Sequence, residues 1–167
     1  MDSVTWAWGI GGGLAVLVVG MGAAILKVGL DGVASEPKGW DPVAKGLHPK
    51  VTSPDAWTHL RPVLHAQPDD ALRMFYLQEA AAWLEETSDE EAEALAAPVR
   101  GTADDPLGWV FLAAVALKRA VKARGHGTAD TVTEDGGNLF TARAAQANAF
   151  LERARELDPE HPLALAL

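Results

Sequence analysis

The stretch DDPLGWVFLAAVALKRAVKAR, from Asp104 to Arg124, decides the fold of this chain. Its Asp-Asp-Pro start is typical of a helix N-terminus, because Asp caps exposed amide groups and proline suits the first helical turn. The apolar face that follows is wide enough to be sandwiched between neighbouring helices. Its members are Leu107, Trp109, Val110, Leu112, Ala113, Ala116, Leu117 and Ala120. We therefore expect a long central helix, whose basic last turns complement the helix dipole.

Three helices are expected before this stretch. Ser53-Pro54-Asp55 predicts a helix start with Ser53 as the N-cap, and Pro62 is expected to disturb that helix. Asp69-Asp70 opens a second helix, whose apolar residues follow the spacing of a buried stripe. Ser88-x-x-Glu91 is a capping box, which predicts a short helix that Pro98 ends.

One long helix is expected after it. Residues 125–137 contain four glycines and little apolar content, which predicts a loop. Apolar residues then recur at helical spacing until Leu157, and Pro159 lies just beyond the expected helix end. These residues are Phe140, Ala144, Ala147, Leu151 and Ala154. Because no alternating run typical of a strand is found, the predicted fold class is all-α.

The end of the chain carries a family resemblance. The segment ANAFLERARELDPEHPLALAL resembles the second helix of a tetratricopeptide repeat and the start of the next, with Ala147, Leu151, Ala154 and Pro159 at the consensus spacing. Together with the run from Arg124 to Glu134, it makes residues 106–163 similar to an uncharacterised actinobacterial family of helical, tetratricopeptide-like domains. The resemblance implies a helical hairpin with an expanded loop and no assigned activity. Further helices normally follow in that family, so either a partner covers the open face or the chain is a piece of a longer protein.

The N-terminus reads as a membrane anchor. No charged residue occurs in the 24 positions between Asp2 and Lys27, and about 20 helical residues cross a bilayer core. Trp6 and Trp8 suit the headgroup boundary, and the lack of basic residues before the apolar run argues against a cleaved signal. We therefore predict an anchor at 1–28 with its transmembrane helix at 4–26, a surface linker at 29–52, and a helical repeat-like domain at 53–167. Lysines after the span favour a cytoplasmic domain.

Small residues within the anchor suggest a packing face. Gly9 and Gly13 form a G-x-x-x-G pair, and Gly20 and Ala24 repeat the spacing. These four residues are the candidate contact for self-association of the anchor into a homo-oligomer. The alternative is chance, since the span contains six glycines.

Composition and motifs exclude several functions. The net charge of −9 disfavours nucleic acid as a partner, and the absence of cysteine removes disulfides and thiolate metal sites. The five histidines show no metal-ligand spacing, and no motif of a hydrolase, a phosphate-binding loop or a dinucleotide fold is present. We therefore expect no metal, no cofactor and no enzymatic activity.

One loop carries enough polar groups to serve as a ligand site. Arg124, His126, Thr131 and Glu134 are the candidate ligand-binding residues, although the same side chains can instead pin the loop through hydrogen bonds. The expected function is a single-pass scaffold in the cell membrane that binds another protein through its helical-repeat domain. The alternatives are a structural subunit of a membrane complex and a small-ligand-binding domain that uses the loop 124–135.

Overall fold

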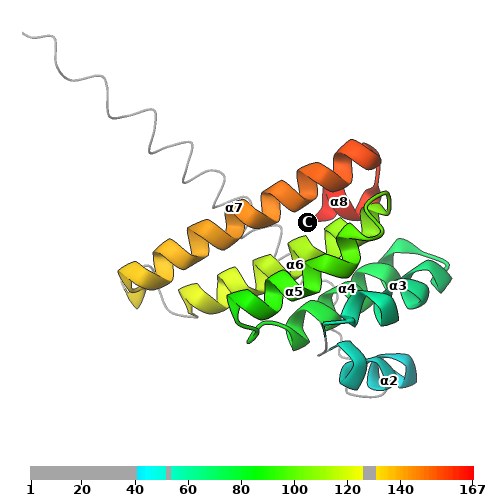
Figure 1. The fold of residues 1–167 in the computed structure, drawn as a ribbon, viewed down its shortest axis with the longest axis horizontal. Coiled ribbons are helices and arrows are strands. Elements are labelled where there is room, and N and C mark those ends of the chain that lie inside the picture. Colours follow the sequence, from blue (N-terminus) through cyan, green and yellow to red (C-terminus); the bar gives the residue numbers. More distant parts are fainter. Residues whose placement is uncertain (1–40, 52–53, 126–130) are drawn as a thin grey trace, which may run out of the picture. The chain divides into compact units, whose positions relative to one another are not determined.

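A computed structural model describes residues 41–51, 54–125 and 131–167, and within these ranges all the regular structure is helical (Figure 1). The all-α prediction is therefore confirmed for this part of the chain. None of its helices combines the length and apolar character needed to cross a membrane. The predicted anchor helix at 4–26, with Gly9, Gly13, Gly20 and Ala24, lies outside the described residues.

Helix α6, Pro106–Arg124, is the centre of the fold, as its sequence predicted. Eleven of its nineteen residues are buried, and it contacts α3, α4, α5, α7 and α8. Asp105 caps it, with Oδ1 accepting a hydrogen bond from the Leu107 amide. A helix with this much apolar surface is stable only when neighbours cover most of its circumference.

Helix α7, Glu134–Leu157, runs antiparallel along α6 and makes the most extensive contact between described helices (Figure 1). Ala147, Leu151 and Ala154 are its buried apolar residues, as the repeat-like spacing predicted. The loop before α7 is shorter than expected, because the helix already includes Gly136. A Cβ atom at Gly136 would lie 2.7 Å from the Ala123 carbonyl oxygen, so glycine is what permits α7 to begin against the end of α6.

Four further helices pack on α6. They are α3 (Ala56–Ala66), α4 (Asp70–Trp83), α5 (Asp89–Arg100) and the short α8 (Pro162–Ala166). The capping box of Ser88 and Glu91 at the start of α5 is confirmed.

Three expectations about prolines in and before α3 and α5 were wrong. Helix α3 starts at Ala56 after Asp55 rather than with Ser53 as its cap, and it continues through Pro62. Likewise α5 continues through Pro98 to Arg100. Pro62 and Thr58 both lie on the exposed side of α3. Because proline has no amide hydrogen, the Thr58 carbonyl oxygen lacks its helical hydrogen-bond partner. Water can satisfy that carbonyl, so the helix tolerates the proline.

The predicted linker at 29–52 contains a helix, which is a further correction. Helix α2, Pro42–Val51, buries Ala44, Leu47 and Val51 and packs on α3 and α4. Asp41 caps it, since Oδ1 accepts hydrogen bonds from the amides of Val43 and Ala44 at 2.8 and 2.9 Å. Sequence reasoning missed α2 because its lysines, glycine and internal proline obscure three apolar residues at helical spacing.

We predict that Ala147→Leu destabilises the protein, because Ala147 is fully buried in the contact between α6 and α7. Overpacking a core typically costs about 1–3 kcal/mol, which corresponds to several degrees in the melting midpoint. Circular dichroism of the detergent-solubilised chain measures the change. Ala149→Leu adds the same side chain at an exposed position of α7, and Gln146→Leu tests a second exposed position. Equal melting midpoints for Ala147→Leu and wild type would mean that the face of α7 is wrongly assigned.

Candidate functional site

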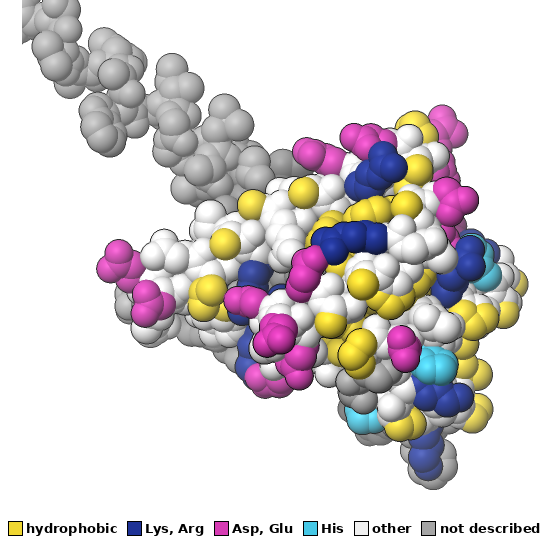
Figure 2. Space-filling model, in the orientation of Figure 1, with side chains coloured by type: hydrophobic (Ala, Val, Ile, Leu, Met, Phe, Trp, Pro, Cys, Tyr) yellow, Lys and Arg dark blue, Asp and Glu magenta, His cyan; other side chains and the backbone are white. Residues whose placement is uncertain are grey.

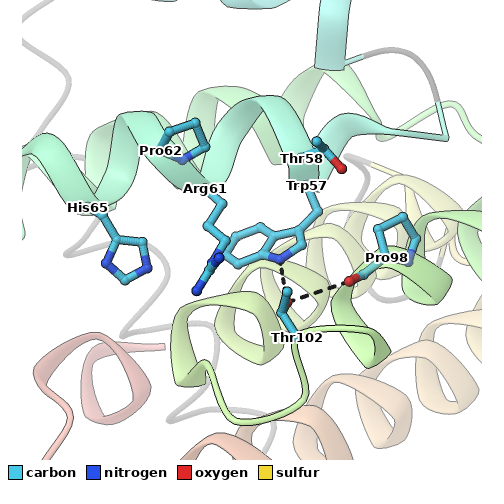
Figure 3. A pocket seen from close by; sticks show the side chains of 7 residues that line it. All are labelled: Trp57, Thr58, Arg61, Pro62, His65, Pro98 and Thr102. Atoms are coloured by element: carbon cyan, nitrogen blue, oxygen red, sulfur yellow. Dashed lines mark hydrogen bonds between the residues drawn. The ribbon is translucent and has the colours of Figure 1, made fainter.

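An open groove of about 420 Å³ lies beside α3, and polar and aromatic side chains converge there (Figure 3). Helix α3 forms one wall, and the end of α5 with the turn that follows it forms the other. The lining residues are Trp57, Thr58, Arg61, Pro62, His65, Pro98 and Thr102. The groove therefore combines an apolar surface with two nitrogen-rich side chains on one helix.

A rigid indole forms the floor of the groove. Trp57 is 1% exposed, and its Nε1 donates a hydrogen bond to Thr102 Oγ1 at 2.8 Å. Its ring stacks on Phe111 of α6 at a centroid distance of 5.9 Å. Gly108 allows this packing, since a Cβ atom there would lie 3.1 Å from the indole and 2.9 Å from Val99. Because Trp57 is almost fully buried, stacked on Phe111 and hydrogen-bonded through Nε1, the floor is fixed in shape.

Asp105 holds the two nitrogen-rich side chains in place. Its carboxylate oxygen Oδ2 accepts a hydrogen bond from Arg61 Nε at 2.7 Å and lies 2.8 Å from His65 Nε2. The Asp105 side chain is only 5% exposed, whereas those of Arg61 and His65 are 44% and 51% exposed. One buried carboxylate thus caps α6 and orients two exposed groups of α3.

The pKa of Asp105 reflects this arrangement. Burial alone raises the pKa of the carboxyl, but hydrogen bonds from Arg61 and His65 and from the Leu107 amide outweigh it, and the net pKa is lowered. Asp105 is therefore a carboxylate at neutral pH.

The outer atoms of Arg61 and His65 remain open. Among the described residues, the terminal guanidinium nitrogens of Arg61 have no protein partner, because only Nε contacts Asp105. Figure 3 shows Trp57, Arg61 and His65 projecting from the same side of α3. A guanidinium fixed through Nε still presents hydrogen-bond donors to a carboxylate or a carbonyl oxygen.

A second charged cluster joins α5, α6 and α7 through ion pairs and hydrogen bonds, and it leaves one buried nitrogen, Arg143 Nε, without a hydrogen-bond partner among the described residues. Arg119, 2% exposed, donates Nε to the Thr87 carbonyl oxygen at 3.1 Å and forms an ion pair with Asp89. Arg143 donates to Asp89 Oδ1 at 3.1 Å and to the Arg119 carbonyl oxygen at 3.0 Å. Hydrogen bonds from Arg119 and then Arg143 lower the pKa of Asp89. This cluster links three helices.

Three of the predicted ligand-binding residues, Arg124, Thr131 and Glu134, are not part of the lining of the groove. Arg124 is exposed at the end of α6, with its Cζ atom 6.0 Å from the Phe140 ring centroid. Thr131 and Glu134 are also exposed, and His126 lies outside the described residues. None of these residues lines the groove beside α3, and a ligand at this loop stays a prediction.

Sequence reasoning missed the groove itself. The available signal was the spacing of Arg61 and His65, which lie one helical turn apart and therefore on one face of a helix. Their common partner is 40 residues or more away in the sequence, and Asp105 was predicted only as part of a helix start. Within the described ranges, no group of three His, Asp or Glu side chains is arranged to hold a metal ion.

The lowered pKa of Asp105 predicts a pH-dependent stability. The carboxylate stabilises the fold at pH values above its unfolded-state pKa of about 3.9, and this contribution is lost as the pH falls through the lower folded-state pKa. Asp105→Asn can still cap α6 but cannot pair with Arg61. We expect this variant to unfold at lower urea concentration than wild type at pH 6, with a difference that shrinks below about pH 4.

Two variants complete this test. Asp104→Asn changes the exposed neighbouring carboxylate and should leave the urea midpoint unchanged at both pH values. Asp105→Ala also removes the cap, which costs about 0.5–2 kcal/mol more. A pH-independent difference between Asp105→Asn and wild type would contradict the assigned ion pairs.

Comparisons of the chain with protein-family models, with curated proteins and with solved structures find no match. The interpretation of the groove therefore rests on its own geometry and chemistry.

Proposed function

We propose that this chain is a membrane-anchored helical adaptor, which binds an extended, carboxylate-bearing segment of a partner protein in the groove beside α3. One observation carries the proposal: buried Asp105 holds Arg61 and His65 beside a fixed apolar floor, while the outer nitrogens of Arg61 stay open. Such an arrangement lowers the entropic cost of binding, because the recognising side chains are already ordered.

The shape and chemistry of the groove favour a peptide segment. Pro62 and Pro98 offer apolar contact along an open surface above the buried Trp57, and Thr102 and Arg61 lie at its polar edge. Asp105 offsets one positive charge, so recognition depends on the direction of the guanidinium donors rather than on net charge. A carboxylate matches a pair of guanidinium nitrogens in a planar, bidentate geometry. An acidic side chain flanked by apolar residues is the matching ligand.

The membrane part of the proposal rests on the sequence. The uncharged stretch before Lys27 is long enough to span a bilayer, and the lysines that follow favour a cytoplasmic helical domain. A single-pass adaptor in the cell membrane places its groove within reach of other membrane-bound proteins.

Peptide selection tests the groove. The full chain in lipid nanodiscs is panned against displayed random dodecapeptides, and we expect enrichment of Asp or Glu beside apolar residues. Arg61→Gln should weaken the selected peptides by tenfold or more, since hydrogen bonds to charged groups contribute roughly 1.5–3 kcal/mol. Arg153→Gln is the matched control, because Arg153 on α7 is 45% exposed, nearly the same as the 44% of Arg61. Peptides without acidic residues, or equal binding by Arg61→Gln and wild type, would disprove the proposed function.

Fractionation tests the anchor. We expect the full chain to stay in the membrane pellet after a carbonate wash, because a transmembrane helix at residues 4–26 is not extracted by high pH. A variant that lacks residues 1–28 should move to the soluble fraction, since the apolar residues that remain fit amphipathic helices. Release of the full chain by carbonate, or pelleting of the shortened chain, would contradict the anchor.

A further inference from the structure

Two exposed side chains of α3 share a single oxygen atom of Asp105. Arg61 Nε lies 2.7 Å and His65 Nε2 lies 2.8 Å from Oδ2 of that carboxylate. The sum of these distances limits the separation of the two nitrogens to 5.5 Å. Arg61 and His65 also lie one helical turn apart, and both line the groove of the proposed function. An anion that binds the guanidinium of Arg61 is therefore close to the imidazole of His65.

The contact with Asp105 determines which nitrogen of His65 takes up a proton. Burial is outweighed by hydrogen bonds from Arg61 and His65, so the pKa of Asp105 is lowered and its side chain stays a carboxylate. A carboxylate accepts hydrogen bonds and donates none, so His65 Nε2 carries a hydrogen atom even in the neutral ring. Nδ1 has no hydrogen-bond partner among the described residues, and the side chain is half exposed. Nδ1 is therefore the atom that gains or loses the proton.

Protonation of Nδ1 reverses what His65 offers to a ligand. In the neutral ring Nδ1 is a hydrogen-bond acceptor, whose lone pair repels a carboxylate. In the protonated ring Nδ1 is a donor, and the ring adds a positive charge beside that of Arg61. Between about pH 5 and pH 8 a guanidinium and a peptide carboxylate keep their charges, whereas histidine is the side chain that usually changes its own.

The charged groups of α4, α5 and α6 leave this arrangement undisturbed. From α4, Arg73 donates to carbonyl oxygens at the end of α3 and pairs with Asp70. From α5, Arg100 pairs with Glu93. At the start of α6, Asp105 is the acidic group that contacts His65. The local charge around His65 is therefore set by Asp105 and Arg61.

The basic groups of α2 lie by another hollow. Lys50 lines a space of about 380 Å³ between α2 and α3, together with His59 of α3, and the ring of His48 packs edge-on against Trp83 of α4. Figure 2 shows histidine side chains next to basic ones over the region of α2 and α3. A test that uses pH therefore needs a control for these neighbouring histidines.

We propose that His65 is a recognition residue of the groove, and that its Nδ1 takes up a proton from solvent when a peptide carboxylate binds to Arg61. The inference rests on the proposed function and deepens it, because it names the condition that favours binding. An acidic segment is held more tightly as the pH falls from 8 to 6, since the imidazolium and the guanidinium then meet one carboxylate.

Calorimetry tests the uptake of the proton. The full chain in phosphatidylcholine nanodiscs is titrated with the most enriched acidic dodecapeptide of the selection described above. We expect binding at pH 6 to be at least about fivefold tighter than at pH 8, because a second positive charge lies near the carboxylate. Titrations at pH 7 in buffers of different ionisation enthalpy should show net proton uptake. The same peptide with Asn or Gln in place of its acidic residue should show neither effect.

His65→Gln separates proton uptake from a purely structural role. Its amide can still donate to Asp105 but does not titrate, so the pH dependence and the proton uptake should both disappear. Binding at pH 8 should stay within about twofold of wild type, because the neutral imidazole adds no charge there. His59→Gln removes another exposed histidine of α3 and should keep both effects. Proton uptake that survives His65→Gln, or equal wild-type affinity at the two pH values, would overturn the inference.

The proposed function is scored separately, by whether the selection enriches acidic peptides. If it does not, that function fails, and the chain with ¹³C-labelled histidine is titrated with glutarate, a small dicarboxylate, and followed by NMR at pH 6 and pH 8. The signal that is lost in His65→Gln assigns the ring. A shift of this signal that is larger at pH 6 and vanishes in Arg61→Gln then supports the proton-linked carboxylate site by itself. A shift that is absent, or equal at both pH values, overturns it.

Discussion

The burial of α6 is the constraint on which the rest of the structure depends. Its apolar residues leave no broad polar face, so α7 must cover one side, and α3, α4 and α5 the other. Close approach is possible because small residues lie at the contacts, among them Gly108 beside Trp57 and Ala147 in α7. The orientation of α3, and therefore of the candidate groove, follows from how α6 is packed.

Two buried charges on or beside α6 connect the helices around it. Asp105 lies at the positive end of the helix dipole, which stabilises its charge, whereas Arg119 lies before the last turn of α6 and is stabilised by its partners. The partners of Arg119 are an acceptor pair, the Thr87 carbonyl and Asp89, and Asp89 is shared with Arg143. The partners of Asp105 are hydrogen-bond donors. The terminal guanidinium nitrogens of Arg61 have no protein partner among the described residues. That difference makes the Arg119 cluster a link between helices, whereas the Asp105 cluster leaves donors open for the ligand proposed above.

The sequence predicts the elements of this fold better than the site. Apolar spacing and end signals locate α6 and α7 and the capping box of α5, because those signals are local. The prediction that Pro62 disturbs α3 was wrong, because Pro62 lies on the exposed side of the helix, where a missing amide hydrogen bond costs little free energy. Helix α2 depends on burial against α3 and α4, which its lysines and glycine do not reveal. The groove needs Asp105 beside Arg61, a contact across 44 residues that no local pattern encodes.

The two faces of α3 have different roles in the fold. Trp57, Leu60 and Leu64 are buried and fix the helix against its neighbours, whereas Thr58 and Pro62 lie on its exposed side. Arg61 and His65 are also exposed, and both contact Asp105 at the start of α6. Because one carboxylate holds both side chains, a change that shifts the start of α6 would displace them together.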